Sequence, residues 1–557
     1  MSADRPVDPE EPVVAESADP VSEWADPVDD DVDAGRGGAR PAPSPGRGRR
    51  RWARVLPWLR VVALAGAGAA LVAGAARLPA TDLSEGRTEA PGVTASGRAV
   101  QPVTETALAC VGPPQLGLPD PAVPEQAQTV GLVALAGPEE VLGTELAALA
   151  ARDAGHLELG LVPGGPPAVS TTVRGELLGT KVSTPQGVVV HADDGLAPAV
   201  TAGQWNLSRQ EGQRGLSAQP CLPPTTDAWL LAGGGDPGRL ERLVLVNPGS
   251  DPVTVRVDVH GQDGPLPAPG GQGVVVPGRD RVVLLLDALA PSEPAPAVHV
   301  TTLGGPVAVA LADRWLEGTL DRGTELTVPT SPGTALVVPA VPAPADPDAG
   351  RTRLRVAVPG EEEAIVQVRA LTPDGPARVE NDVTTVAAGS VADLDLGTLP
   401  DGTHALEVTG DVPVVAALEV EQRAAADGAA DMAWVPATAR IERLAGAVLP
   451  FAGVANPQVR TGATLTLASP AGARVEVVVL DNVGATTSTE VDVPAAGAVT
   501  QDVAGNAAVW VRPLQGDVHA ALTGTGPEDE VGPLVAGYPL AEVPVTQEVV
   551  PVRPWRP

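Results

Sequence analysis

The stretch VTVRVDVH (Val253–His260) alternates valine with a polar or charged residue over eight positions. In an extended strand, successive side chains point to opposite faces, so the four valines would form one apolar face and the other residues a polar one. The same alternation recurs at residues 364–370 and 473–479. This pattern predicts half-buried antiparallel strands and an all-β fold.

A glycine follows each of these strands at the same distance. Gly264, Gly375 and Gly484 each lie five residues after the last apolar position of their strand. Glycine adopts the positive φ angles that tight connections require, so these residues are predicted to be structural turn glycines. A second glycine follows in each copy, at Gly278, Gly389 and Gly497.

The repeated unit has the size of a whole domain. Its turn glycines are 111 and 109 residues apart, and a degenerate upstream copy ends at Trp205 where the next ends at Trp315. Repeats of about 100 residues match immunoglobulin-like antiparallel β-sandwiches rather than solenoid units. The sequence therefore predicts four such modules in a row, at residues 106–228, 229–335, 336–437 and 438–557, the last including a C-terminal tail.

A different kind of segment precedes the modules. Sixteen uncharged residues, Val61–Ala76, follow eight arginines that lie between Arg36 and Arg60, whereas only Arg77 follows them closely. We predict a transmembrane helix at residues 55–77, in a single-pass plasma-membrane protein whose N-terminus is cytoplasmic and whose C-terminal region is extracytoplasmic. Two alternatives are a cleaved signal peptide ending at Ala73-Gly74-Ala75 and a twin-arginine export signal at Arg50-Arg51.

The segments on either side of this helix are polar. Residues 1–54 combine repeated Asp-Pro with an acidic-to-basic switch, which is typical of a disordered tail. Residues 78–105 are predicted to be a stalk. The net charge of the chain is −32, mostly beyond residue 77, which excludes nucleic acid as a main partner because phosphate backbones are repelled.

The chain has two cysteines, Cys110 and Cys221, one at each end of the first module. In an oxidising extracytoplasmic compartment an even pair favours a disulfide, which would close a loop of about 110 residues. Two free thiols or an intermolecular bridge are the alternatives.

Several short motifs resemble a known family. They are the turn Cys221-Leu222-Pro223-Pro224, the strand end Asn247-Pro248-Gly249 and the segment Asp431–Pro436. Over roughly residues 100 to 550 the chain resembles an actinobacterial family of uncharacterised, exported, single-pass envelope proteins with a domain of unknown function. The resemblance implies a membrane-tethered β protein often associated with envelope glycoconjugates, and it supplies no catalytic residue.

No motif in the sequence predicts a reaction or a cofactor. The six histidines lack the spacing of a zinc site, and no serine stands in a Gly-x-Ser-x-Gly elbow. Gly233-Gly234-Gly235 lacks the lysine of a phosphate loop and is interpreted as a hairpin connection. The acidic clusters Asp193-Asp194-Gly195 and Glu361–Glu363 are interpreted as solvated turns, with weak calcium binding as the alternative.

Trp205, Trp315 and Trp434 each follow the terminal hairpin of a module. We predict that they pack at module junctions, with glycan stacking as the alternative. The sequence as a whole predicts a non-enzymatic scaffold or accessory factor in cell-envelope assembly, bound to the membrane through its N-terminal helix. Alternatives are a cell-surface glycan-binding or adhesion module and an enzyme that acts on wall polymer. Expected partners are envelope proteins or glycans.

Overall fold

The computed structural model describes residues 99–549, with gaps at 119–124, 153, 166–167, 344–349, 426–427, 450–460 and 527–530. All of these belong to one compact unit, residues 89–557. The predicted tail, the transmembrane helix and the stalk up to residue 98 lie outside the described residues. Within the described part, no helix has the length and apolar character to cross a membrane.

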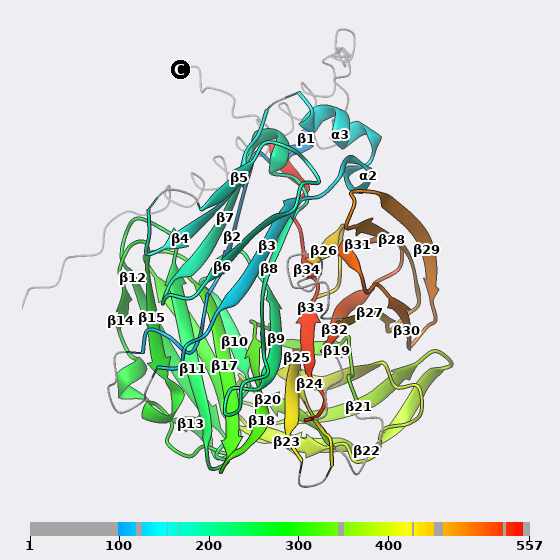
Figure 1. Cartoon of the computed structure of the whole chain (residues 1–557). Coiled ribbons are helices and arrows are strands. Elements are labelled where there is room, and N and C mark those ends of the chain that lie inside the picture. The colour runs from blue at the N-terminus through cyan, green and yellow to red at the C-terminus, as the bar shows by residue number, and fades with distance from the viewer. Residues whose placement is uncertain are drawn as a thin grey trace, which may run out of the picture. The chain divides into compact units, whose positions relative to one another are not determined.

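The fold is all-β, as predicted, with 59% of the described residues in strands and 5% in helices. Every strand pair is antiparallel, and the sheets fall into four modules of two sheets each (Figure 1). That each module is an immunoglobulin-like sandwich stays a prediction.

Module 1 (Glu105–Pro220) has two four-stranded sheets. In spatial order the first contains β2 (Glu105–Cys110), β7 (Gly187–Asp193), β4 (Leu157–Val162) and β5 (Val169–Thr171). The second contains β6 (Leu178–Val182), β3 (Val130–Ala136), β8 (Val200–Ser208) and β9 (Gly215–Pro220). Short helices that the sequence analysis missed interrupt the strands: α2 (Glu139–Leu142), α3 (Thr144–Ala150) and the 3₁₀ turn Asp194–Leu196.

Module 2 (Asp227–Thr327) contains the stretch Val253–His260, in which valines alternate with polar residues. Its first sheet is β10 (Asp227–Leu231), β16 (Ala297–Leu303), β12 (Val253–Gly261) and β13 (Gly264–Leu266), with β14 (Val274–Val276) also paired to β12. Its second is β15 (Asp280–Leu285), β11 (Arg239–Asn247), β17 (Ala308–Glu317) and β18 (Leu320–Thr327). Two 3₁₀ turns lie at Pro269–Gly271 and Leu286–Ala288.

Module 3 (Gly333–Pro436) is organised around one long strand, β24 (Ala405–Arg423). The first half of β24 pairs with β21 (Ala364–Thr372) and β19 (Gly333–Val338), and β21 pairs with β22 (Gly375–Val386). The second half pairs with β20 (Gly350–Ala357) and β25 (Ala430–Pro436), and β20 pairs with β23 (Val391–Asp395). A single strand thus belongs to both sheets.

Module 4 (Ala445–Glu542) has sheets of five and four strands. The first is β29 (Thr486–Val493), β28 (Ala473–Asp481), β31 (Asn506–Gln515), β26 (Ala445–Val448) and β34 (Ala541–Glu542). The second is β30 (Gly497–Asp502), β27 (Gly462–Ser469), β32 (His519–Thr525) and β33 (Val535–Pro539). Outside the modules, β1 (Ala99–Pro102) pairs with β35 (Thr546–Val549).

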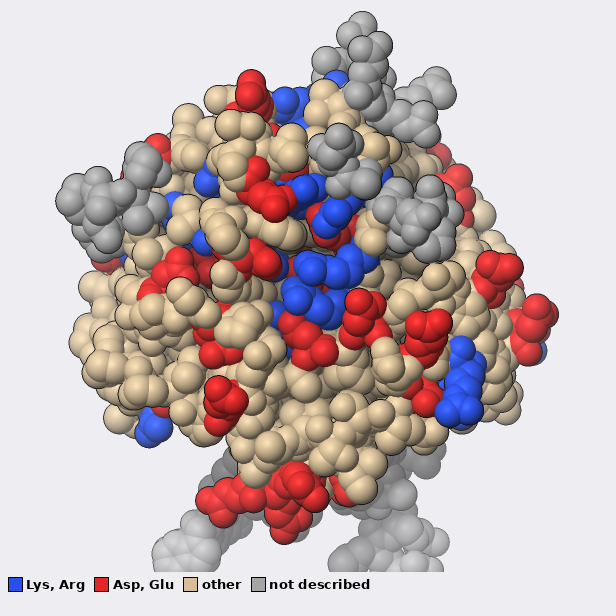
Figure 2. All heavy atoms as spheres, turned by 90° about the horizontal axis from the view of Figure 1, so that it is seen from below, with Lys and Arg blue, Asp and Glu red and all other residues tan. Residues whose placement is uncertain are grey.

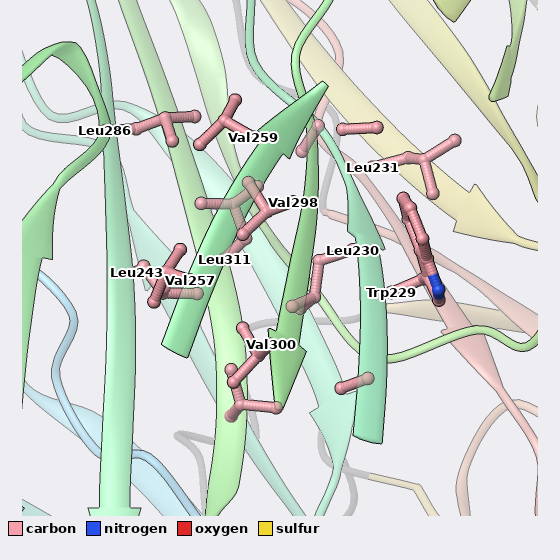
Figure 3. Close-up of a cluster of buried hydrophobic side chains, with 14 of the residues drawn as sticks. Trp229, Leu230, Leu231, Leu243, Val257, Val259, Leu286, Val298, Val300 and Leu311 are labelled. Atoms are coloured by element: carbon pink, nitrogen blue, oxygen red, sulfur yellow. The ribbon is translucent and has the colours of Figure 1, made fainter. Parts of the chain in front are cut away.

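The alternating valines of β12 pack as predicted. Val253, Val255, Val257 and Val259 are all buried, whereas Thr254 and Arg256 between them are exposed. In Figure 3, Val257 and Val259 of β12 lie near Leu243 of β11 and Leu311 of β17, which belong to the other sheet of the module. Burial of such side chains contributes about 1.5 to 3 kcal/mol each, and this is the main source of each module's stability.

The modules do not follow one another in a row as the sequence analysis expected. Shared hydrophobic clusters join module 1 to 2, 2 to 3 and 3 to 4. A further cluster joins module 4 back to module 1, where Val133 and Leu135 pack with Trp510 and Val448. The prediction of a stalk is also wrong for residues 99–102, because these residues form the strand β1. The modules close on one another because each keeps apolar residues outside its own sheet interior, and a linear string would leave these exposed.

Candidate functional site

One edge strand from each of the four modules lies beside the others near the middle of the unit (Figure 1). They are β9, β18, β25 and β33, and each is an edge strand hydrogen-bonded to only one neighbour in its sheet. The free edge of such a strand presents backbone N–H groups that need acceptors once they are buried. We call this region the axial core.

Asp431 of β25 supplies those acceptors at one level of the axial core. Its carboxylate accepts backbone N–H groups from all four modules, at N···O distances of 2.9 Å from Leu216, 3.3 Å from Thr324, 3.0 Å from Met432 and 3.0 Å from Val535. The Asp431 side chain is fully buried. A carboxylate offers about four lone-pair positions, so one side chain satisfies four edge strands.

Glu325 of β18 has the same role one level further along. Its two carboxylate oxygens accept the backbone N–H groups of Leu326 at 2.8 Å and of Gly537 at 3.1 Å. Space around Asp431 is provided by Gly323, whose φ is +118° and where a Cβ would lie 2.5 Å from the Asp431 Oδ1 atom. A larger residue at position 323 would collide with the carboxylate.

A second buried polar network joins modules 2 and 3. The guanidinium of Arg239 binds Asp313 at 2.9 Å and Glu419 of module 3 at 2.7 Å. Arg355 of module 3 donates to the carbonyl oxygens of Ala232 and Pro296 in module 2, at 3.1 and 3.0 Å. Arg239, Asp313 and Glu419 are all buried, so removal of one of these charged side chains would leave its partner buried without a compensating charge.

Burial and charge shift the pKa values of these carboxyl groups in different directions. Burial raises the pKa of Asp431 to about 8, against the opposing effect of its N–H donors. Burial, and then the charge of Asp313, raise the pKa of Glu241 to about 8 as well. Burial acts to raise the pKa of Glu419 too, but Arg239, Arg353 and neighbouring arginines outweigh it and lower that pKa to about 2.

These shifts predict that stability falls as the pH rises from about 4 to 8. In this window the folded protein retains protons on Asp431 and Glu241 that the unfolded chain has released, so raising the pH favours unfolding. The lowered pKa of Glu419 acts in the opposite sense only below its ordinary value of 4.5. Urea unfolding at pH 5 and pH 8 measures the difference, and Glu241→Gln is expected to reduce it. Equal or greater stability at pH 8 would show that the N–H donors outweigh burial.

The predicted disulfide between Cys110 and Cys221 is confirmed. It joins the end of β2 to the residue that follows β9, at a sequence separation of 111. Gly264, Gly375 and Gly484 have φ angles of +114°, +109° and +88°, and each lies where one strand turns back into the next.

Asn247-Pro248-Gly249 forms the turn after β11. The buried Asn247 side chain accepts the N–H of Gly249 at 2.9 Å and donates to the carbonyl oxygens of Asp251 and Val276, at 2.7 and 3.2 Å. Gly233-Gly234-Gly235 is also a connection between strands. Its N–H groups at Gly233 and Gly234 donate to Asp313 and Glu241 at 3.1 and 2.8 Å, so these donors are already used within the protein.

The three tryptophans do not occupy corresponding positions, contrary to the prediction. Trp205 and Trp315 lie on the second-to-last strands of their modules, whereas Trp434 lies on a last strand. The half-buried Trp205 packs against the core of module 4, and Trp434 packs into the core of module 2. Trp315 is flanked by Arg239 and Arg322 of its own module.

Trp434→Phe is expected to lower the free energy of unfolding by about 1 to 3 kcal/mol, because it removes the 2.8 Å hydrogen bond from the indole Nε1–H to the buried Asp313. Trp315→Phe is the matched control. Its indole donates to the carbonyl of Pro237 at 3.3 Å, so a smaller loss is expected. Thermal and urea unfolding of the two variants check this. A larger loss for Trp315→Phe would contradict the assigned role of Trp434.

One pocket has a volume of about 420 Å³ and lies where modules 3 and 4 meet the segment that follows module 2. Its walls are mostly apolar, including Leu336, Ala437 and Pro470. His519 in this pocket has its Nδ1 3.0 Å from the carbonyl oxygen of Thr438, which requires Nδ1 to carry a proton, and burial lowers its pKa. Among the described residues no group of three or more His, Cys, Asp or Glu is arranged to hold a metal ion.

The axial core was not predicted, although the sequence contains a weak signal for it. Gly215, Gly323, Asp431 and Leu534 each precede one of the four N–H donors that bind Asp431, and a proline follows each of them five or six residues later. An alignment of these four segments on their N–H donors places Asp431 opposite Gly215, Gly323 and Leu534. Asp431 is the charged residue among these four positions, which would have marked it as unusual.

Comparison with curated proteins found no match. Among solved structures, a crystal structure of a tetra-tandem repeat in the extending region of a large adhesion protein matches with 12% identity and a TM-score of 0.09, covering 69% of this chain and 90% of that one. A family model matches residues 177–504, more than half of the chain, which spans the end of module 1 to the middle of module 4. The protein therefore belongs to DUF5719, a family of unknown function.

Proposed function

We propose that this protein is a membrane-anchored, extracytoplasmic and non-enzymatic scaffold or accessory factor in cell-envelope assembly. The observation that carries the proposal is the use of the buried ionisable groups. Asp431, Glu325, Arg239 and Glu419 hold modules to one another through backbone and side-chain bonds. An assembly platform needs modules held in fixed positions, and these contacts serve that purpose.

Two further features support an extracytoplasmic location. The Cys110–Cys221 disulfide is typical of proteins that fold in an oxidising compartment. On the face shown in Figure 2, basic side chains gather near the middle and are flanked by acidic ones, and the net charge of the chain is −32. Such a surface suits a soluble domain that contacts proteins or neutral glycans better than one that binds nucleic acid.

Substituted cysteines test the predicted topology. Val483 is 89% exposed in the turn after β28, so Val483→Cys is expected to react with a membrane-impermeant maleimide on intact cells. Ser17→Cys, in the predicted cytoplasmic tail, is expected to react only after lysis. The native cysteines do not interfere because they are joined in the disulfide. Labelling of Ser17→Cys on intact cells, with Val483→Cys protected, would reverse the proposed orientation.

Proximity labelling in living cells tests the scaffold function. A labelling enzyme active outside the membrane, fused after residue 557, is expected to enrich envelope-assembly proteins. The matched control fuses the same enzyme after residue 98 and so lacks all four modules. Identical sets of labelled proteins would show that the modules recruit no partner, and the scaffold proposal would fail.

A further inference from the structure

A second pocket lies between modules 1 and 2, beside the axial core, with which it shares Thr324. Its volume is about 170 Å³. Most of its lining side chains carry amide or hydroxyl groups, and one carries a guanidinium: Gln115, Gln126, Gln128, Thr129, Asn206, Ser208, Gln210, Gln213, Arg314 and Thr324. We call it the amide pocket.

Gln115 is the best-defined donor of the amide pocket. It is 5% exposed, and its Oε1 atom accepts a hydrogen bond from the buried Arg242. This bond fixes the orientation of the amide, because only Oε1 can accept. The Gln115 Nε2 atom is buried and has no hydrogen-bond partner among the described residues. An unpaired buried amide N–H₂ is costly, and a ligand in the pocket would satisfy it.

Acceptors lie among the same lining residues. The Oε1 atom of Gln126 is buried and has no partner within the described part of the chain. Asn206 uses its Nδ2 to donate to the carbonyl oxygen of Thr129 at 2.8 Å, which leaves Oδ1 as the atom that can accept from a ligand. Donors and acceptors that alternate in this way match hydroxyl groups, since each hydroxyl both donates and accepts.

The arginines give the site a positive charge. Arg314 lines the pocket, and Arg242 lies behind Gln115. No salt bridge joins either arginine to a carboxylate among the residues that the structure describes. Burial lowers the pKa of both guanidinium groups, and the charge of Arg314 lowers that of Arg242 further, whereas the charges of Asp321 and Glu125 act against these effects at Arg314 and Arg242, respectively. A bound anion would offset the positive charge that these more distant carboxylates leave.

The volume of the pocket limits the size of the ligand. An engineered cavity of about 150 Å³ in another protein holds one benzene molecule, so about 170 Å³ accommodates one six-membered ring. We infer that the amide pocket binds a single sugar ring that carries a carboxylate, with the hydroxyl groups on the amides and the carboxylate facing Arg314. This inference is independent of the proposed scaffold function and extends the protein's activity to ligand binding.

The test is a calorimetric titration of the detergent-solubilised full-length protein with glucuronate and galacturonate. At least one of the two is expected to bind saturably with a Kd of about 1 mM or below. Glucose and galactose are expected to bind at least about tenfold more weakly, because they lack the carboxylate. Absence of saturable binding by either sugar acid would overturn the inference, as would equal binding of the neutral sugars.

Variants locate the binding at the amide pocket. Arg314→Gln and, separately, Gln126→Leu are each expected to weaken binding of the sugar acid at least about tenfold. Gln126 is only partly buried, so its replacement tests the site even if Arg314→Gln fails to fold. Arg256→Gln and Gln262→Ala are matched controls at exposed positions of module 2 and should bind as wild type does.

Two outcomes would move the site or change its ligand. Unchanged affinity in Gln126→Leu would place any binding elsewhere. Full competition by acetate or sulfate at equal concentration would show a plain anion site that does not recognise the sugar ring. Either result would overturn the inference, whereas retention of sugar-acid binding in excess acetate would support it.

Discussion

Asp431→Ala is expected to lower the free energy of unfolding by at least about 4 kcal/mol. The substitution leaves four backbone N–H groups without an acceptor in the axial core, those of Leu216, Thr324, Met432 and Val535. Each unsatisfied buried group costs about 1 to 3 kcal/mol. Since a typical domain has only about 5 to 15 kcal/mol of stability, much of the protein should be unfolded or aggregated. Urea unfolding followed by tryptophan fluorescence measures the loss.

Asp481→Ala provides the matched control for this prediction. Asp481 also accepts two backbone N–H groups, those of Val483 and Ala485, but it does so in an exposed turn where water can replace it. The expected loss is about 1 kcal/mol or less. If the two substitutions reduced stability equally, the four hydrogen bonds to Asp431 would not be what holds the modules together.

Replacing both Cys110 and Cys221 with serine is expected to cost about 3 to 5 kcal/mol. Without the disulfide, the unfolded chain gains the entropy of a loop spanning 111 residues, which is worth about 4.7 kcal/mol in the chain-entropy model. The loss should appear as a lower denaturant midpoint with a larger m-value, because the unfolded chain without the cross-link is less compact and exposes more surface.

Reduction of the wild-type protein is the internal control for the cysteine variant. Wild-type protein in excess dithiothreitol should unfold at the same urea concentration as the double serine variant. A variant as stable as the oxidised wild type would show that the packing of modules 1 and 2 alone fixes the ends of module 1, because Ala109 and Val111 beside Cys110 already pack against module 2.

Much of the strand pattern could be predicted from the sequence because it is local. The valines of residues 253–260 and the glycines that follow report which face of a strand is buried and where it turns, and both features depend on residues close in sequence. The disulfide could be predicted because only one pairing exists for two cysteines. The short helices at residues 139–150 were missed because four to seven residues carry too little periodicity.

The arrangement of the modules depends on contacts between residues hundreds of positions apart. Leu216 and Val535 bind the same carboxylate oxygen of Asp431 across sequence separations of 215 and 104, and the proline that follows in each segment is only a weak local signal. Trp434 was correctly expected to be buried between modules, but the equivalence with Trp205 and Trp315 was inferred from spacing alone. Likewise, the side-chain amides that line the amide pocket come from separate segments of the chain, and these segments share no sequence motif that would predict a binding site.

The contacts between module 4 and module 1 also determine when folding can finish. Synthesis delivers the chain from its N-terminus, so β9 and Trp205 arrive more than 300 residues before β33, which completes their surroundings. The pairing of β1 with β35 likewise waits for almost the whole chain. During this interval module 1 exposes the apolar surface that module 4 will cover. Module 1 therefore has to be shielded until the C-terminal strands arrive, and truncation near the C-terminus should harm the first module as much as the last.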